Sequence, residues 1–188
     1  MTRSILLVGV GGQGIILTSK ILAKALINEG FDVKMSEVHG MAQRGGSVTT
    51  QVRYGEKVFS PIIGKGKADI LVAFEEMEAM RYIEFLNPEG VLIVNPHRIH
   101  SAPISRGASK YPDGIIDELK NKVNTVVINA SEEAKKIGNI RVQNIILLGK
   151  LAKFLNLKKA NWDDILKNNI KEKYIDINLK AFETGLNF

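Results

Sequence analysis

The sequence predicts an α/β fold: a doubly wound, Rossmann-like, mostly parallel sheet with an antiparallel ribbon and a helical C-terminal tail. Apolar runs typical of buried strands alternate with segments of helical periodicity. A glycine-rich segment separates the first run from the first helix, and only helical patterns follow residue 141. At 188 residues and 45% hydrophobic content, the chain is long enough to bury its own core, so we expect a single domain over residues 1–188.

The first third of the chain holds two strands, a helix and the ribbon. Residues 4–10 form an uninterrupted branched apolar run, as in a strand that is buried on both faces. Helical spacing of apolar residues follows over residues 16–26. Residues 31–37 supply a second strand, which we expect to lie beside the first and parallel to it. Residues 47–61 alternate with period two across a turn at Gly55, which predicts the antiparallel ribbon.

The remaining segments continue the alternation and then become helical. Residues 68–96 read as strand, helix and strand, and residues 124–137 as a strand and a helix capped by Ser131. Residues 141–155 and the segment from 161–174 onward predict two or three helices. The first of these helices is strongly apolar, so it either packs against the sheet or docks on a partner.

The turn from the first strand into the first helix is a candidate anion site. Gly9, Gly11 and Gly14 match the pattern G-x-G-x-x-G, and Gly12 adds a further residue without a side chain. Such a turn lets backbone N–H groups approach a ligand and directs the positive end of a helix toward it. A phosphate or pyrophosphate is the natural ligand, and a tight turn with close helix packing is the alternative interpretation.

A second glycine-rich loop follows the second predicted strand, and the topology brings the two loops together at one edge of the sheet. Gly45 and Gly46 offer backbone N–H groups, while Arg44 and Ser47 supply a guanidinium and a hydroxyl suited to phosphate oxygens.

Two polar residues before this loop have open roles. Glu37 stands roughly 20 residues after Gly14, where an acid of the dinucleotide fold binds a ribose hydroxyl, or else it accepts hydrogen bonds within its own loop. His39 either meets a ligand between the two loops or is a turn residue bonded to backbone.

Composition excludes several functions. The chain has no cysteine and therefore cannot hold an iron–sulfur cluster by thiolates. Its formal charge of +6 is spread over mixed charges, and only 6% of residues are aromatic, which argues against nucleic acid as a partner. No apolar stretch approaches the ~20 residues that span a bilayer, and we expect a cytoplasmic protein. His97 and His100 have no acidic residue close to them in sequence, so we expect no metal site there.

Four stretches carry a family resemblance: GVGGQGIILTSKILAKAL with SEVHGMAQRGGSVTTQVRYG, then ADILVAFEEMEAMRYIEFLNPEGVLIVN and INLKAFETG. They resemble the gamma-type domain of the 2-oxoacid:ferredoxin oxidoreductases, also called the pyruvate/ketoisovalerate oxidoreductase catalytic domain. The loop SEVHGMAQRGGSV is most similar to the beta subunits of the indolepyruvate branch. The resemblance covers nearly the whole chain.

The resemblance implies an accessory subunit that is inactive alone. The family decarboxylates 2-oxoacids oxidatively, here arylpyruvates, and passes electrons to ferredoxin while coenzyme A takes the acyl group. Thiamine diphosphate and the iron–sulfur clusters would belong to a large alpha subunit, and this chain would contribute the coenzyme A phosphate site. The isolated chain either stays single or associates with itself. The resemblance implies this binding role for eight positions, which are Gly11, Gly12, Gln13, Gly14, Arg44, Gly45, Gly46 and Ser47.

Two other functions stay open at this point. A self-contained NAD-dependent oxidoreductase would use the same glycine pattern with Glu37, although no substrate domain or acid–base pair accompanies it. A nucleotide-binding regulatory module is suggested by the charge alone.

Overall fold

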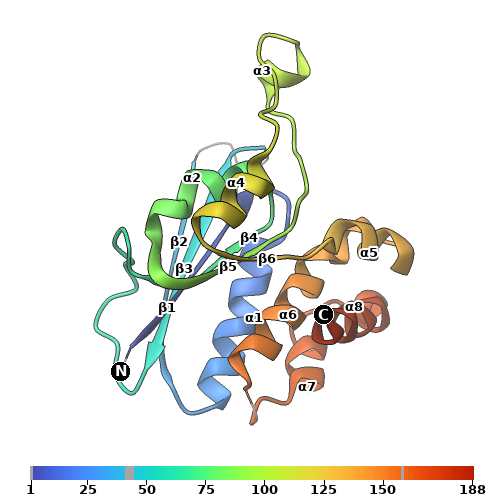
Figure 1. Ribbon diagram of the computed structural model, residues 1–188. Coiled ribbons are helices and arrows are strands. Elements are labelled where there is room, and N and C mark those ends of the chain that lie inside the picture. Colours follow the sequence, from blue (N-terminus) through green and yellow to red (C-terminus); the bar gives the residue numbers. More distant parts are fainter. Residues whose placement is uncertain (1, 41–44, 158) are drawn as a thin grey trace.

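The computed structural model describes residues 2–40, 45–157 and 159–188 and contains a six-stranded sheet with the order β2-β3-β1-β4-β5-β6. Helices cover both faces (Figure 1). The α/β fold, the mostly parallel sheet and the helical C-terminal tail are therefore confirmed. In the part of the chain that the structure describes, no helix has the length and apolar character needed to cross a membrane.

The elements follow one another in the order that the alternating pattern predicts. The strands are β1 (Arg3–Val10), β2 (Asp32–His39), β3 (Ser47–Gly55), β4 (Ala68–Ala73), β5 (Leu86–Val94) and β6 (Asn124–Val127). The helices are α1 (Ile15–Asn28), α2 (Glu76–Tyr82), α3 (Ala102–Ser105), α4 (Ile115–Lys122), α5 (Ala130–Ile137), α6 (Gln143–Leu155), α7 (Trp162–Lys167) and α8 (Ile175–Asn187).

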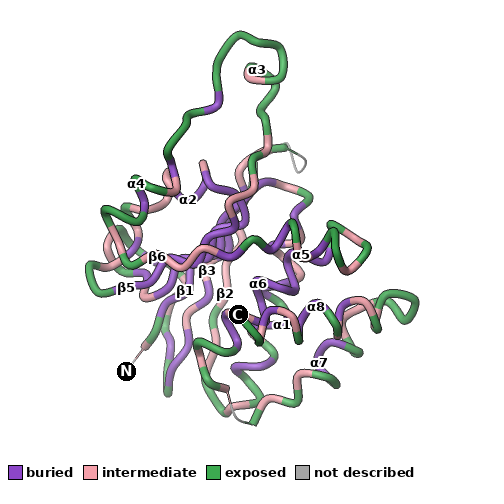
Figure 2. The backbone as a smooth tube through the Cα atoms, turned by 45° about the vertical axis from the view of Figure 1, so that its right-hand side comes forward, coloured by how far each residue is buried: buried purple, intermediate pink, exposed green. Residues whose placement is uncertain are grey.

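The central strand β1 divides the core into two layers. Its Ile5 and Leu7 belong to the larger layer, formed with α1, α5, α6, α7 and α8, while Leu6 and Val8 belong to the smaller layer under α2 and α4. Successive side chains of a strand point to opposite faces, so a continuous apolar run is what burial on both faces requires. Figure 2 shows this central part of the sheet as buried.

The prediction for the ribbon is correct in kind and wrong in its partners. Strand β3 pairs with β2 on one side, Asp32 opposite Gly55, and with β1 on the other, Arg3 opposite Tyr54, both antiparallel. Residues 57–61 are not a strand. The period-two pattern of β3 reflects its place between two other strands of the sheet. It does not reflect a hairpin within residues 47–61.

The insertion of β3 also corrects the expected neighbourhood of the first two strands. Strands β1 and β2 point the same way, but β3 lies between them. Their carboxyl ends still meet at one edge of the sheet, because each is antiparallel to β3.

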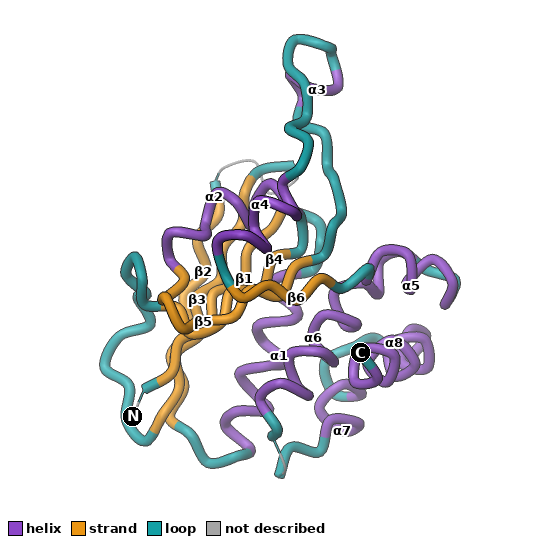
Figure 3. The backbone as a smooth tube through the Cα atoms, in the orientation of Figure 1, coloured by secondary structure: helices purple, strands orange, loops and turns teal. Residues whose placement is uncertain are grey.

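Helices α6 and α7 pack against α1, and α8 packs against α5, α6 and α7 (Figure 3). Helix α6 has Ile145, Ile146, Leu147 and Leu148 fully buried, so most of its apolar character serves the core, while Phe154 near its end is 46% exposed. It touches α8 at two glycines, Gly149 and Gly185, and a Cβ added to Gly149 would lie 3.0 Å from the Cα atom of Gly185.

Local details differ from expectation at two places. Helix α5 begins after Asn129, and Ser131 lies inside the helix with its hydroxyl donating to Gln143 Oε1 over 2.6 Å instead of capping it. The short helices α3 and α4 were not expected. The connection between β5 and α4, which includes α3, is mostly exposed, and its outer part stands away from the body as an arm (Figures 1 and 2).

Candidate functional site

The glycine turn, residues 9–14, joins the carboxyl end of β1 to the start of α1. Gly14 begins the helix with φ +80°, and a Cβ there would come within 2.5 Å of Asn144 Nδ2. Gly12 also has a positive φ, +103°, but no atom lies within 4 Å of the place a Cβ would take. Gly14 therefore serves close packing of α1 on α6, whereas Gly12 presents bare backbone to open space.

Gln13 holds this turn to the sheet. Its side chain is 6% exposed, and its Oε1 accepts from Val10 N over 2.8 Å while its Nε2 donates to Phe74 O over 2.8 Å. One amide thus connects the last residue of β1 with the residue that follows β4. Both polar atoms of the side chain are therefore engaged in holding the turn.

The second loop meets the glycine turn through backbone hydrogen bonds, as predicted. Gly11 N donates to Gly46 O over 2.8 Å, and Gly45 N donates to Gly11 O over 3.3 Å. These two N–H groups are consequently occupied, which corrects their expected role as ligand donors. Arg44 lies outside the described residues.

Other N–H groups of the turn remain available. Among the described residues, the N–H groups of Gly12 and Gly14 have no backbone partner, and the first N–H groups of α1 are unpaired as at any helix start. Together with the helix dipole, they form a natural site for an anion.

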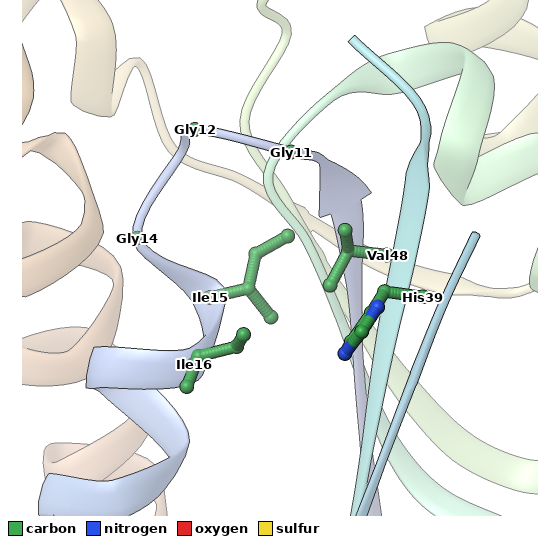
Figure 4. A pocket seen from close by; sticks show the side chains of 7 residues that line it. All are labelled: Gly11, Gly12, Gly14, Ile15, Ile16, His39 and Val48. Carbon is green, nitrogen blue, oxygen red and sulfur yellow. The ribbon is translucent and has the colours of Figure 1, made fainter. Parts of the chain in front are cut away.

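An apolar pocket of about 310 Å³ lies on one side of the turn. Figure 4 shows Ile15 and Ile16 from α1 facing Val48 of β3 and the ring of His39 across it. His39 is exposed, with Nδ1 3.4 Å from Gly40 O, so it is the polar group of an otherwise apolar wall.

A polar cavity of about 400 Å³ lies on the other side and shares Gly12 and Gly14 with the apolar pocket. The C-terminal helices and their connections supply the rest of its wall. The charged and polar residues that line it are Gln13, Asn139, Arg141, Asn144, Asn169, Lys171, Tyr174 and Asn178.

Ser47 faces a carboxylate. Its hydroxyl donates to Glu78 Oε2 over 2.5 Å, and Arg81 Nη1 donates to Glu78 Oε1 over 2.7 Å. This arrangement occupies the hydroxyl that was predicted for phosphate and places a buried acid beside it.

Three acids within four residues at the start of α2 are almost completely buried: Glu75, Glu76 and Glu78. Glu75 caps the helix, accepting from Glu78 N over 2.9 Å, and also accepts from the Tyr111 hydroxyl at the base of the arm. Glu76 pairs with Arg98. Burial raises the pKa of the Glu76 and Glu78 carboxyls above the usual value, and the partners of each offset this only in part.

The raised pKa of Glu78 gives a stability prediction. A carboxyl whose pKa is raised by folding stabilises the fold below its unfolded pKa, and this contribution is lost as pH rises through the folded value. Glu78→Gln removes that loss. The stability of the variant minus that of the wild type is therefore expected to be larger at pH 7 than at pH 4. Urea unfolding at both pH values measures it, with the exposed Glu89→Gln as control for one lost charge. An equal change in relative stability between pH 4 and pH 7 for Glu78→Gln and Glu89→Gln would contradict the prediction.

The remaining predicted residues are dispersed. Glu37 lines neither the apolar pocket nor the polar cavity, and its Oε1 lies 3.9 Å from Lys20 Nζ on α1. Its ribose role stays a prediction. Burial lowers the pKa of His97, and the ring of His100 lies beside that of Tyr111. Within residues 2–40, 45–157 and 159–188, no three histidine, aspartate or glutamate side chains are grouped so as to hold a metal.

Sequence reasoning missed the polar cavity. Arg141, Lys171 and Tyr174 lie far from the glycine turn in the chain, in segments that read only as helical. No motif joins them, because the packing of α6 on α1 and of α8 on α6 is what brings these segments together beside the turn.

A doubly wound sheet with a glycine turn at its carboxyl edge is found in many proteins that bind a phosphate-bearing ligand. The sequence profile described as pyruvate ferredoxin/flavodoxin oxidoreductase matches residues 4–188. The chain belongs to this family.

Several curated relatives match over the full length. The indolepyruvate oxidoreductase subunit IorB of Archaeoglobus fulgidus is 40% identical over 100% of this chain and 95% of its own. The proteins of the same name from Methanothermobacter thermautotrophicus and Thermococcus kodakarensis are 40% and 36% identical, over 98% and 97% of this chain and 96% and 94% of their own lengths. The chain is accordingly one subunit of a multi-subunit oxidoreductase.

Solved structures agree on the fold. The gamma subunit of a keto/oxoacid ferredoxin oxidoreductase from Geobacter sulfurreducens superimposes with a TM-score of 0.73 at 26% identity, covering 98% of this chain and 96% of that one. The 2-oxoglutarate:ferredoxin oxidoreductase from Magnetococcus marinus, solved with 2-oxoglutarate, coenzyme A and succinyl-CoA, gives 0.76 at 22% identity, covering 99% of this chain and 30% of that one.

Proposed function

We propose that this chain is the accessory beta subunit of an indolepyruvate ferredoxin oxidoreductase and that its glycine turn binds coenzyme A. A large alpha subunit would carry thiamine diphosphate and the iron–sulfur clusters, oxidise arylpyruvates to aryl-acetyl-CoA and pass electrons to ferredoxin in the cytoplasm. The name shared by relatives of matching length supports this reaction. The absence of cysteine from the sequence agrees with clusters held on another subunit.

The observation that carries the coenzyme A proposal is the position of Gly12. Its bare backbone lies between the apolar pocket and the polar cavity, at the positive end of α1. Coenzyme A has phosphates at one end and a long, weakly polar thiol arm at the other. A site with N–H donors in the middle, cations on one side and an apolar wall on the other suits such a molecule.

The residue pattern of an NAD site receives less support. In the dinucleotide fold an acid at the end of the second strand reaches the ribose next to the glycine turn. Here β3 separates β2 from β1, and the Glu37 carboxylate lies beside Lys20. The Glu37 carboxylate therefore lies beside a cation on α1 and does not line the spaces next to the glycine turn.

Gly12→Ala is expected to weaken coenzyme A binding about 10-fold, the loss of roughly one charge-assisted hydrogen bond, because a Cβ would enter the space where a phosphate approaches. Calorimetric titration of the chain in complex with its larger subunit, with coenzyme A and with NADH, is the measurement.

Gly30→Ala is the matched control. Gly30 lies just beyond the other end of α1, has φ +96° and also has open space around it, so both variants carry similar backbone strain. An equal loss of affinity in both variants, or binding of NADH and not of coenzyme A, would overturn the proposal.

A further inference from the structure

The polar cavity, whose wall also includes Leu17, Val142 and Ile170, has positively but no negatively charged side chains among its lining residues. Two cations, Arg141 and Lys171, line it, and none of its lining residues is acidic. Among the described residues neither cation forms an ion pair, whereas elsewhere Arg81, Arg98 and Lys122 lie within 3.2 Å of carboxylates. The field in the cavity therefore favours negative charge.

Two buried asparagines add acceptors to this wall. Asn144 is 4% exposed, and its Nδ2 donates to Gly14 O over 3.4 Å; Asn178 is 9% exposed, and its Nδ2 donates to Tyr174 O over 2.7 Å. Within the described part of the chain their Oδ1 atoms have no hydrogen-bond partner, although both residues line the cavity. These two Oδ1 atoms are accessible from the cavity, so beside two cations they are acceptors open to a ligand that carries both hydrogen-bond donors and negative charge.

We infer that the polar cavity binds the phosphorylated nucleoside part of a ligand, with phosphate oxygens at Arg141 and Lys171 and ligand hydroxyl or amino groups donating to Asn144 and Asn178. This inference rests on the proposed function and assigns an orientation to the bound coenzyme A. The nucleotide end of coenzyme A lies in the polar cavity, its pyrophosphate crosses the N–H groups at Gly12, and its thiol arm runs into the apolar pocket toward His39.

The residues that line the apolar pocket disfavour the opposite orientation of coenzyme A. The apolar pocket is lined by Ile15, Ile16, Val48 and His39, and it has no lysine or arginine among its lining residues. Beyond Val48, the Ser47 hydroxyl donates to Glu78 and is therefore not free to bind a phosphate.

The test uses the full chain in complex with its larger subunit and four ligands: coenzyme A, adenosine 3′,5′-bisphosphate, inorganic pyrophosphate and pantetheine. Arg141→Ala and Lys171→Ala are each expected to weaken coenzyme A and the bisphosphate about 10-fold and to leave pantetheine unchanged. Lys167→Ala is the control, since it removes an exposed lysine of α7 that does not line the cavity. Melting temperatures should stay the same, because all three side chains are exposed.

The outcomes separate the two proposals. Unchanged coenzyme A affinity in both variants would overturn the inference and leave the proposed function standing. If both variants lose bisphosphate binding, the cavity is supported as the nucleotide site. If, in addition, the wild-type protein binds coenzyme A no more tightly than the bisphosphate, the proposed direction of the thiol arm is contradicted. Pyrophosphate binding as tight as that of the bisphosphate would show a site for free anions and overturn the nucleoside part of the inference.

Discussion

Gly149→Ala is expected to lower the free energy of unfolding by about 2 kcal/mol, although alanine is the better helix former. In an exposed helix interior this change would gain up to about 1 kcal/mol. Here a Cβ on Gly149 would come closer than 3.0 Å to the carbonyl oxygen of Phe182, and one on Gly185 would do the same to that of Ile146. Both obstacles are backbone atoms of the opposite helix, so α6 and α8 must separate, and overpacking typically costs about 1–3 kcal/mol or more.

Thermal and urea unfolding measure this effect, and for a chain of this size a loss of about 2 kcal/mol lowers the melting temperature by roughly 4–8 °C. Gly185→Ala should behave alike. Gly64→Ala is the control, because a Cβ there would meet only Lys67 Cγ at 3.7 Å, which is ordinary contact. A stability of Gly149→Ala equal to or above wild type would show that the two helices adjust freely.

Gln13→Ala is expected to cost about 2–4 kcal/mol of stability and to weaken ligand binding at the glycine turn. The change leaves Val10 N and Phe74 O without their side-chain partner in a buried place, and each unsatisfied buried group costs about 1–3 kcal/mol. Asn95 Nδ2 lies 3.3 Å from the same Phe74 oxygen and offsets a part of the loss.

Urea unfolding gives the stability, and titration with coenzyme A at a temperature where the variant stays folded gives the affinity. Asn168→Ala, the loss of an exposed amide at the end of α7, should stay within about 0.5 kcal/mol of wild type. A Gln13→Ala protein with wild-type stability and reduced affinity would mean that Gln13 touches the ligand instead of holding the turn.

The sequence predicts the elements that rest on local pattern. The double burial of β1 is visible as an unbroken apolar run, and α1 as helical spacing that ends before Gly30. The position of β3 is not visible, because alternation along a strand reports which faces are buried and says nothing about which strands lie beside it. Pairing of β3 with both β1 and β2 is a long-range choice set by the whole sheet.

For the site, the glycines were predictable and their partners were not. Positive φ at Gly12 and Gly14 follows from a type of turn that only glycine adopts readily. That the Ser47 hydroxyl is occupied by Glu78, and that Arg141 and Lys171 reach the turn, depends on how α2 and the C-terminal helices pack. Side chains supplied by distant segments leave no spacing rule in the chain.

The backbone pairing of Gly11 with Gly46 links ligand binding to the completion of folding. The two loops meet only after β3 has taken its place between β2 and β1, since its first residue lies opposite the last residue of β1. A chain with only local structure, such as a formed α1, has neither the second loop at the turn nor the wall of the apolar pocket. Contacts of this range form slowly compared with helices. A ligand at the turn therefore selects the fully assembled sheet over every partly folded state, and its binding free energy adds to the stability of the whole chain.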